Sequence, residues 1–237
     1  MFVNIPINTI FIGNYAFFNC VSLISIDLAN KIKFIGEHAF SNCKNIESII
    51  IPSNMNSINK NTFSNCKSLK LIMIPININY IDDNAFEYCS SVTILVIKNN
   101  KTSIGNYAFY NCTSLKYINI SDSKYIDNSA KSTKTLLDII ITIPTNVTTI
   151  GNYAFANCRS LKLLSIPNHI SLIGDCAFVN CVSLTSMTIP YNVISIGKSL
   201  FHWCVSLKYI NIPENIVLHE EIYIGCYKLQ RINIIVP

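Results

Sequence analysis

Apolar positions in this sequence recur with a period of 23 residues. Each copy of the period opens on an isoleucine: Ile12, Ile35, Ile58, Ile81, Ile104, Ile150, Ile173 and Ile196. The step from Ile104 to Ile150 is 46 residues long, which is two periods. A period of this length predicts one structural unit repeated along the chain, because stacked units share a continuous core.

Within one copy, small, aromatic and sulfur-containing residues hold fixed positions, as in Ala154, Phe155 and Cys158. The later part follows the pattern L-x-x-I-x-I, and this alternation predicts a short strand with one buried face. Proline usually comes next, as at Pro167, and marks the strand's end because it cannot donate a ladder hydrogen bond. A glycine after the opening isoleucine, such as Gly151, indicates a corner that could need a positive φ.

A single copy cannot bury its own apolar side, whereas stacked copies can. Each strand then joins a parallel sheet about 4.8 Å from its neighbour. We expect one domain over residues 1–237, with a partial first repeat at 1–11. At 121–138 the alanine, phenylalanine and cysteine are missing, and we expect a degenerate, irregular copy there, since the double period is kept. The phenylalanine column is expected to form a continuous buried spine.

The motifs I-G-x-x-A-F-x-x-C-x-S-L and L-x-x-I-x-I-P resemble the BspA-like leucine-rich repeats over nearly the whole chain. The resemblance implies an α/β fold: a right-handed leucine-rich repeat solenoid of about ten 23-residue repeats, with a parallel sheet on the concave face. Proteins of this family are mostly surface antigens and adhesins. The resemblance therefore implies a non-enzymatic protein-interaction module whose partner is a protein, for example one of the host matrix or cell surface. The alternative is an intracellular leucine-rich repeat scaffold or regulatory subunit.

Composition narrows the function classes. Half of the residues are apolar and 13% are charged, and the net charge of +5 is spread along the chain, so nucleic acid is not indicated as a partner. No apolar run is long enough for a transmembrane helix, and no signal peptide is visible at the N-terminus. Cell-surface and cytoplasmic locations therefore both stay open. The four histidines lie in different copies without catalytic partners, so we expect no enzyme and no cofactor.

Nine of the ten cysteines occur once per copy. An evenly spaced column predicts buried, reduced thiols; disulfides and a metal site are the alternatives, and no C-x-x-C pair supports metal. Cys176 differs because it replaces the tyrosine found at Tyr153. Among the thiols it is the candidate for a reactive one, and an inert, partly covered thiol is the alternative. Four asparagines match the N-x-S/T pattern for N-glycosylation: Asn100, Asn111, Asn119 and Asn146. They could be glycosylated only if the protein is exported.

Two surface features are candidate binding sites. Side chains that alternate with the buried strand residues point outward, and in three copies they are apolar where other copies are polar. This apolar patch, with Tyr117 as its rim, is a predicted partner or self-association site: Ile50, Leu71, Met73, Ile94, Val96 and Tyr117.

The basic edge consists of lysines that share one position just before the strand: Lys70, Lys116, Lys162 and Lys208. The last three are expected two copies apart, roughly 10 Å. They could meet an acidic partner or an anionic glycan, or simply keep the face soluble.

Overall fold

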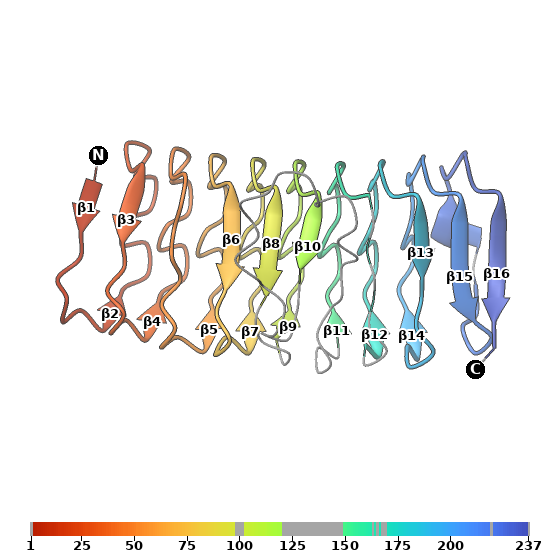
Figure 1. The fold of residues 1–237 in the computed structure, drawn as a ribbon, viewed down its shortest axis with the longest axis horizontal. Coiled ribbons are helices and arrows are strands. Elements are labelled where there is room, and N and C mark those ends of the chain that lie inside the picture. The colour runs from red at the N-terminus through yellow and green to blue at the C-terminus, as the bar shows by residue number, and fades with distance from the viewer. Residues whose placement is uncertain are drawn as a thin grey trace, which may run out of the picture.

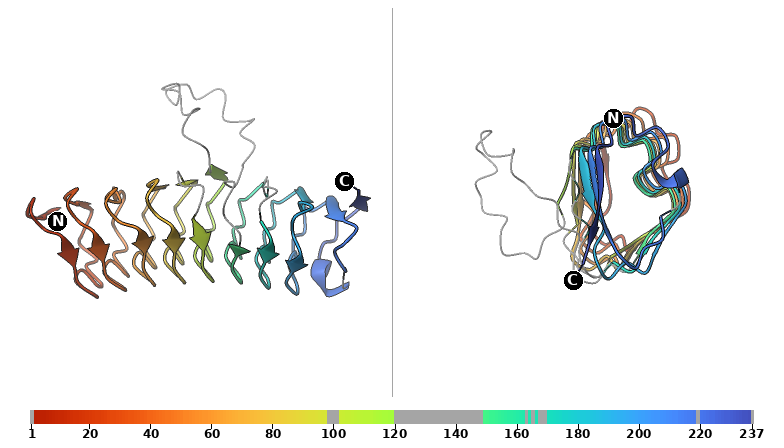
Figure 2. Two further views of the ribbon diagram at one scale, coloured as in Figure 1. Left: turned by 90° about the horizontal axis from the view of Figure 1, so that it is seen from below. Right: turned by 90° about the vertical axis from the view of Figure 1, so that its right-hand side faces the viewer.

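The protein is an elongated stack of coils, each coil being one winding of the chain (Figure 1). The computed structural model describes residues 2–97, 102–119, 149–162, 164, 166, 170–218 and 220–236. Seen along the stack, the coils overlay into one cross-section, with the longer strands on one side and η3 (Glu220–Tyr223) on the other (Figure 2, right). Because all coils share this cross-section, equivalent residues of successive coils form columns along the molecule.

The strands predicted from the alternating pattern form one side, here called the long-strand face. They pair in parallel in three sheets, with orders β1-β3, β6-β8-β10 and β13-β15-β16. Their bounds are β1 (Phe2–Asn4), β3 (Ser25–Asp27), β6 (Leu71–Ile74), β8 (Ile94–Ile97), β10 (Tyr117–Asn119), β13 (Ser186–Thr188), β15 (Tyr209–Pro213) and β16 (Arg231–Ile235). Along β6 the side chains alternate between exposed and buried, so the predicted strand and its buried face are confirmed.

A second set of strands, two residues each, ends on the opening isoleucines. They are β2 (Phe11–Ile12), β4 (Phe34–Ile35), β5 (Ser57–Ile58), β7 (Tyr80–Ile81), β9 (Ser103–Ile104), β11 (Thr149–Ile150), β12 (Leu172–Ile173) and β14 (Ser195–Ile196). Within each of the two sheets that these strands form, β2-β4 and β5-β7-β9-β11-β12-β14, the isoleucine pairs with that of the next coil, as Ile58 does with Ile81. Most other residues of a coil are in turns, and η3 is the one helical element among the described residues. The fold class is therefore the expected leucine-rich repeat solenoid, with almost no helix.

The coils that open at Ile104 and Ile150 are direct neighbours. Ile150 of β11 pairs with Ile104 of β9, and the Phe109 and Phe155 rings stack with centroids 5.7 Å apart. No complete coil can stand between them. The expected count of about ten repeats is thus too high: eight opening isoleucines pair in the corner strands. Residues 121–138 lie outside the described residues.

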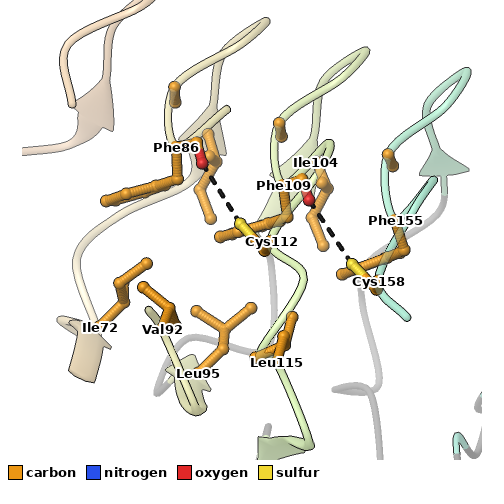
Figure 3. Close-up of a cluster of buried hydrophobic side chains, with 14 of the residues drawn as sticks. Ile72, Phe86, Val92, Leu95, Ile104, Phe109, Cys112, Leu115, Phe155 and Cys158 are labelled. Carbon is orange, nitrogen blue, oxygen red and sulfur yellow. Dashed lines mark hydrogen bonds between the residues drawn. The ribbon is translucent and has the colours of Figure 1, made fainter. Parts of the chain in front are cut away.

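The predicted phenylalanine spine is confirmed. Seven of its rings are completely buried, and each stacks on the next at centroid distances from 5.3 to 6.1 Å. Beside it, eight cysteine thiols of the column, from Cys43 to Cys226, each donate a hydrogen bond to the phenylalanine carbonyl of the preceding coil. Figure 3 shows two of these bonds, from Cys112 to Phe86 at 3.3 Å and from Cys158 to Phe109 at 3.5 Å. The cysteine column therefore joins coils through a polar contact inside an apolar core.

The repeated glycine serves close packing rather than a positive φ. Gly225 is the single described glycine with positive φ. A Cβ on Gly36 would lie 2.3 Å from Asn14 Oδ1, and one on Gly197 would lie 2.2 Å from the Asp175 nitrogen. The predicted reason for these glycines was therefore wrong: at Gly36 and Gly197 the preceding coil lies so close that a Cβ would require a shift of its atoms.

Candidate functional site

The apolar patch borders a groove of about 410 Å³ on the long-strand face. Three of its predicted residues line this groove: Ile50, Leu71 and Met73. Their side chains are 75%, 42% and 42% exposed, respectively. The structure therefore brings large apolar side chains from two neighbouring coils to one concavity.

The backbone register explains this grouping. In β6, Ile72 and Ile74 enter the core, so Leu71 and Met73 face outward. The β6–β8 register sets Leu71 beside Ile94 and Met73 beside Val96; Ile94 and Val96 are half-buried. The backbone of Tyr117 in β10 is paired with Ile94, so the predicted rim residue continues the same row.

The groove lies where the long-strand face changes from one sheet to the next. Residues 49–51 belong to no strand, and this coil is joined to β3 through an isolated bridge between Ser25 and Ser48. Ile49 and Ile51 remain buried, which holds the segment against the core and turns Ile50 outward. As a result, β6 forms the edge of its sheet along the groove.

One exposed apolar residue of the groove was not predicted from the sequence. Ile76 lines the groove and is 57% exposed. It directly follows the strand proline Pro75, where other copies carry polar residues such as Ser53 and Glu214. Not every copy is polar at this position, since Ile7 follows Pro6 in the same way. Ile76 lies outside the alternating strand pattern, and that pattern therefore did not predict it.

All four lysines of the basic edge are exposed, but their spacing differs from the prediction. Lys116 and Lys162 belong to neighbouring coils, because the Ser160 amide donates to the Thr113 carbonyl at 3.2 Å. They are one coil apart, roughly 5 Å, instead of two. Lys162 and Lys208 are two coils apart as predicted, with Thr185 between them.

One lysine of the basic edge is already paired. Lys70 Nζ lies 2.8 Å from Glu47 Oε2, and both side chains are more than half exposed. Such an exposed pair stabilises the fold by about 0–1 kcal/mol, yet it neutralises the local charge. The remaining positive charge of the basic edge lies at Lys116, Lys162 and Lys208, and it is densest where Lys116 and Lys162 are neighbours, beyond the groove along the stack.

The cysteine column is chemically quiet. All ten cysteines are free, and eight are buried. Burial raises the pKa of the Cys43 thiol to about 11 and that of Cys89 to about 12, so both stay protonated at neutral pH and are poor nucleophiles. Cys176 is half-buried, as is Cys20; the predicted reactivity of Cys176 stays a prediction. The described part of the chain contains no group of three side chains suited to hold a metal ion.

Parallel strands, a period of 23 residues and stacked core phenylalanines together define a leucine-rich repeat solenoid. Residues 10–138 and 124–236 match the family model described as BspA type leucine rich repeat region, in six copies. The chain belongs to this family. Within the described residues, no helix has the length and apolar character needed to cross a membrane. No curated protein matches the chain.

Several solved structures are similar to this one. A leucine-rich repeat protein from Bacteroides ovatus has a TM-score of 0.72 and 25% identity over 98% of this chain and 63% of that chain. This chain thus spans under two thirds of that relative. The T. pallidum leucine-rich repeat protein has a TM-score of 0.62 and 25% identity, covering 77% of both chains. A Eubacterium ventriosum protein, at 22% identity, a TM-score of 0.55 and coverage of 98% of this chain and 72% of that one, shares the fold.

Proposed function

We propose that this chain is a non-enzymatic module that binds a partner protein through the apolar patch and its groove. The observation that carries the proposal is the groove itself, where Ile50, Leu71, Met73 and Ile76 surround about 410 Å³ of open space. Leucine-rich repeat proteins are typically non-enzymatic, which agrees with this proposal. The surface belongs to a rigid stack, so little conformational entropy would be lost on binding.

The chemistry of the surface specifies the partner. The groove volume falls within the usual range of about 300–1,000 Å³ for small binding pockets, enough for one or two apolar side chains. Burying them would release water from contiguous apolar surface. Lys116 and Lys162, which form no ion pair within the described residues, favour a partner that carries acidic residues beside its apolar anchor. Such charges mainly raise the association rate.

The test compares variants of the whole chain in their capture of proteins from an extracellular-matrix extract and from a cytosolic extract. Ile50→Asp with Leu71→Asp places two charges in the groove, and it should abolish capture of the partner. Both side chains are exposed, so the fold should remain. The captured protein is then purified, and its affinity for each variant is measured directly.

The matched control is Ile194→Asp, which changes an isoleucine that is 70% exposed and lies outside the groove. It should bind like the unchanged chain. Lys116→Glu with Lys162→Glu should slow association mainly at low salt. If the lysine variant loses binding while the groove variant keeps it, the recognition surface is the basic edge. Capture from the matrix extract would support an adhesin-like role, whereas capture from the cytosolic extract alone would support an intracellular scaffold.

A further inference from the structure

A second concavity lies on the side of the stack opposite the long strands. It encloses about 450 Å³ and is formed by the turn segments of the first four coils. We call it the turn-face hollow. Unlike the apolar groove, it is lined chiefly by amide, hydroxyl and charged side chains between aromatic residues. The two concavities therefore suit different ligands.

The hollow arises from the residues at one repeated position, the seventh of the 23. The second and third coils carry Ser41 and Ser64 there, whereas the first carries Phe18 and the fifth carries Tyr110. Two small side chains in succession leave a depression two coils wide. Phe18 borders it at one end and Tyr88 at the other, three coils apart or roughly 14 Å.

Two hydroxyl groups that line the hollow make no hydrogen bond to any residue that the structure describes. The Ser41 and Ser64 residues are only 4% and 8% exposed, both line the hollow, and neither hydroxyl has a hydrogen-bond partner among the described residues. A buried hydroxyl that makes no hydrogen bond is unfavourable and rare. Between them, Asn65 Nδ2 donates a hydrogen bond to Asn42 Oδ1, which leaves the side-chain Nδ2 of Asn42 and the side-chain Oδ1 of Asn65 without a further partner among the described residues. Donors and acceptors thus alternate across the floor.

The charges in the hollow balance. Lys67 and Glu87 both line it, so neither an anion nor a cation is favoured overall. The Glu87 carboxylate accepts a hydrogen bond from Asn84 Nδ2 at 2.9 Å, and partial burial raises the pKa of its carboxyl group. A neutral ligand with many hydroxyl groups fits this balance.

The aromatic residues at the two ends add a second requirement. Phe18 and Tyr88 are 44% and 40% exposed, so each offers apolar ring surface to a ligand. Aromatic surfaces attract the weakly polarised C–H groups of a ligand. A sugar ring combines such a C–H face with hydroxyls that both donate and accept. We propose that the turn-face hollow binds a neutral sugar unit of a glycan, independently of protein binding at the apolar groove.

The test is a protein-observed NMR titration of the whole chain with the methyl glycosides of glucose, galactose, mannose and N-acetylglucosamine. A shallow site on one sugar ring should give a dissociation constant in the roughly millimolar range. At least one glycoside should shift the backbone amide signals of Ser41, Asn42, Ser64 and Asn65. If none of the four shifts these signals at tens of millimolar concentration, or the shifts lie elsewhere, the proposal is overturned.

Two variants sharpen the result. Ser64→Tyr fills the hollow with the residue that Tyr110 already provides at the equivalent position of another coil, and it should weaken binding by at least about tenfold. Val179→Tyr introduces the same residue at the same repeat position outside the hollow and should bind normally. Ser64→Ala removes one hydroxyl with little change in volume and should weaken binding by about two- to tenfold. Unchanged binding by Ser64→Tyr, with its thermal unfolding midpoint preserved, would refute the site.

The groove variant Ile50→Asp with Leu71→Asp separates the two sites. It should retain sugar binding, because both substitutions lie on the opposite side of the stack. Loss of sugar binding in this folded variant would place the sugar on the long-strand face and overturn the assignment to the turn-face hollow.

Discussion

In each of the eight coils that open on an isoleucine, two positions adopt left-handed backbone conformations without glycine. Asparagine occupies most of the second set, as at Asn19 with φ of 58° and Asn42 with φ of 63°, in keeping with its tolerance of this region. The first set includes bulky residues such as Tyr107 and Tyr153, both with φ of 55°, whose rings stack at 4.7 Å. Stacking between coils thus accompanies an otherwise unfavourable backbone conformation.

The buried thiols predict an alkaline loss of stability. An unfolded thiol releases its proton at a pH of about 8.5, whereas burial raises the pKa of Cys226 to about 11 and that of Cys89 to about 12. The folded chain then binds more protons than the unfolded one above about pH 8.5, so its stability falls as pH rises. Each buried thiol should lower the free energy of unfolding by about 1.4 kcal/mol per pH unit until its folded pKa is reached.

Urea unfolding measured at several pH values from 7 to 9.5 checks this expectation. Stability should be flat at the lower end and fall steeply at the upper end. Cys112→Ala removes one titrating group, so its curve should be shallower by about 1.4 kcal/mol per pH unit, whatever its absolute stability. Parallel curves for the two proteins would show that this thiol does not resist ionisation in the folded state.

The phenylalanine spine is the element on which the stack depends most directly. Phe109 is completely buried, and its ring stacks on Phe86 at 5.4 Å and on Phe155 at 5.7 Å. Phe109→Ala should therefore lower the free energy of unfolding by roughly 3–5 kcal/mol. Because contacts run between adjacent coils, hydrogen-exchange protection should fall mainly in the coils on either side.

The control is Phe11→Ala, since Phe11 is 60% exposed although it also stacks on a neighbouring phenylalanine. It should lower stability by less than about 1 kcal/mol. Equal losses for the two variants, or uniform loss of protection along the whole chain, would contradict a spine that acts through neighbour contacts.

Sequence periodicity could predict the long strands, because alternation over several residues distinguishes a buried face from an exposed one. It could not predict the corner strands, since β5 and its equivalents are two residues long and show no alternation. The apolar patch was recognised from the strand residues, whereas Ile76 follows the strand. The turn-face hollow depends on which residues are adjacent in successive coils, so Ser41 and Ser64 are distinctive only once the stack is known.

At the scale of the whole molecule, the spacing of the opening isoleucines allows two different stacks of coils. A separation of 46 residues between Ile104 and Ile150 fits either two stacked coils or one coil with an insertion of equal length. The contacts decide between them: the Gly151 amide donates to the Ile104 carbonyl at 3.2 Å, and the Tyr107 amide donates to the Asn152 carbonyl at 2.9 Å. Neighbouring coils elsewhere are joined by the same backbone hydrogen bonds. This pairing also brings Lys116 and Lys162 together on the basic edge.

Deleting residues 121–143 should therefore leave the stack intact. The deletion removes 23 residues and joins Ile120 to Pro144, which recreates the I-x-I-P order of Ile72–Pro75 and restores a single period. The hydrogen bond between Gly151 and Ile104 should stay protected from exchange. Stability should be equal or higher by about 1 kcal/mol, because closing a shorter loop loses less chain entropy.

The matched control deletes residues 58–80, a regular coil of the same length, and should lower stability by several kcal/mol since it removes one complete layer of core contacts. Equal losses for the two deletions, measured by urea unfolding, would show that residues 121–143 support the stack as a regular coil does.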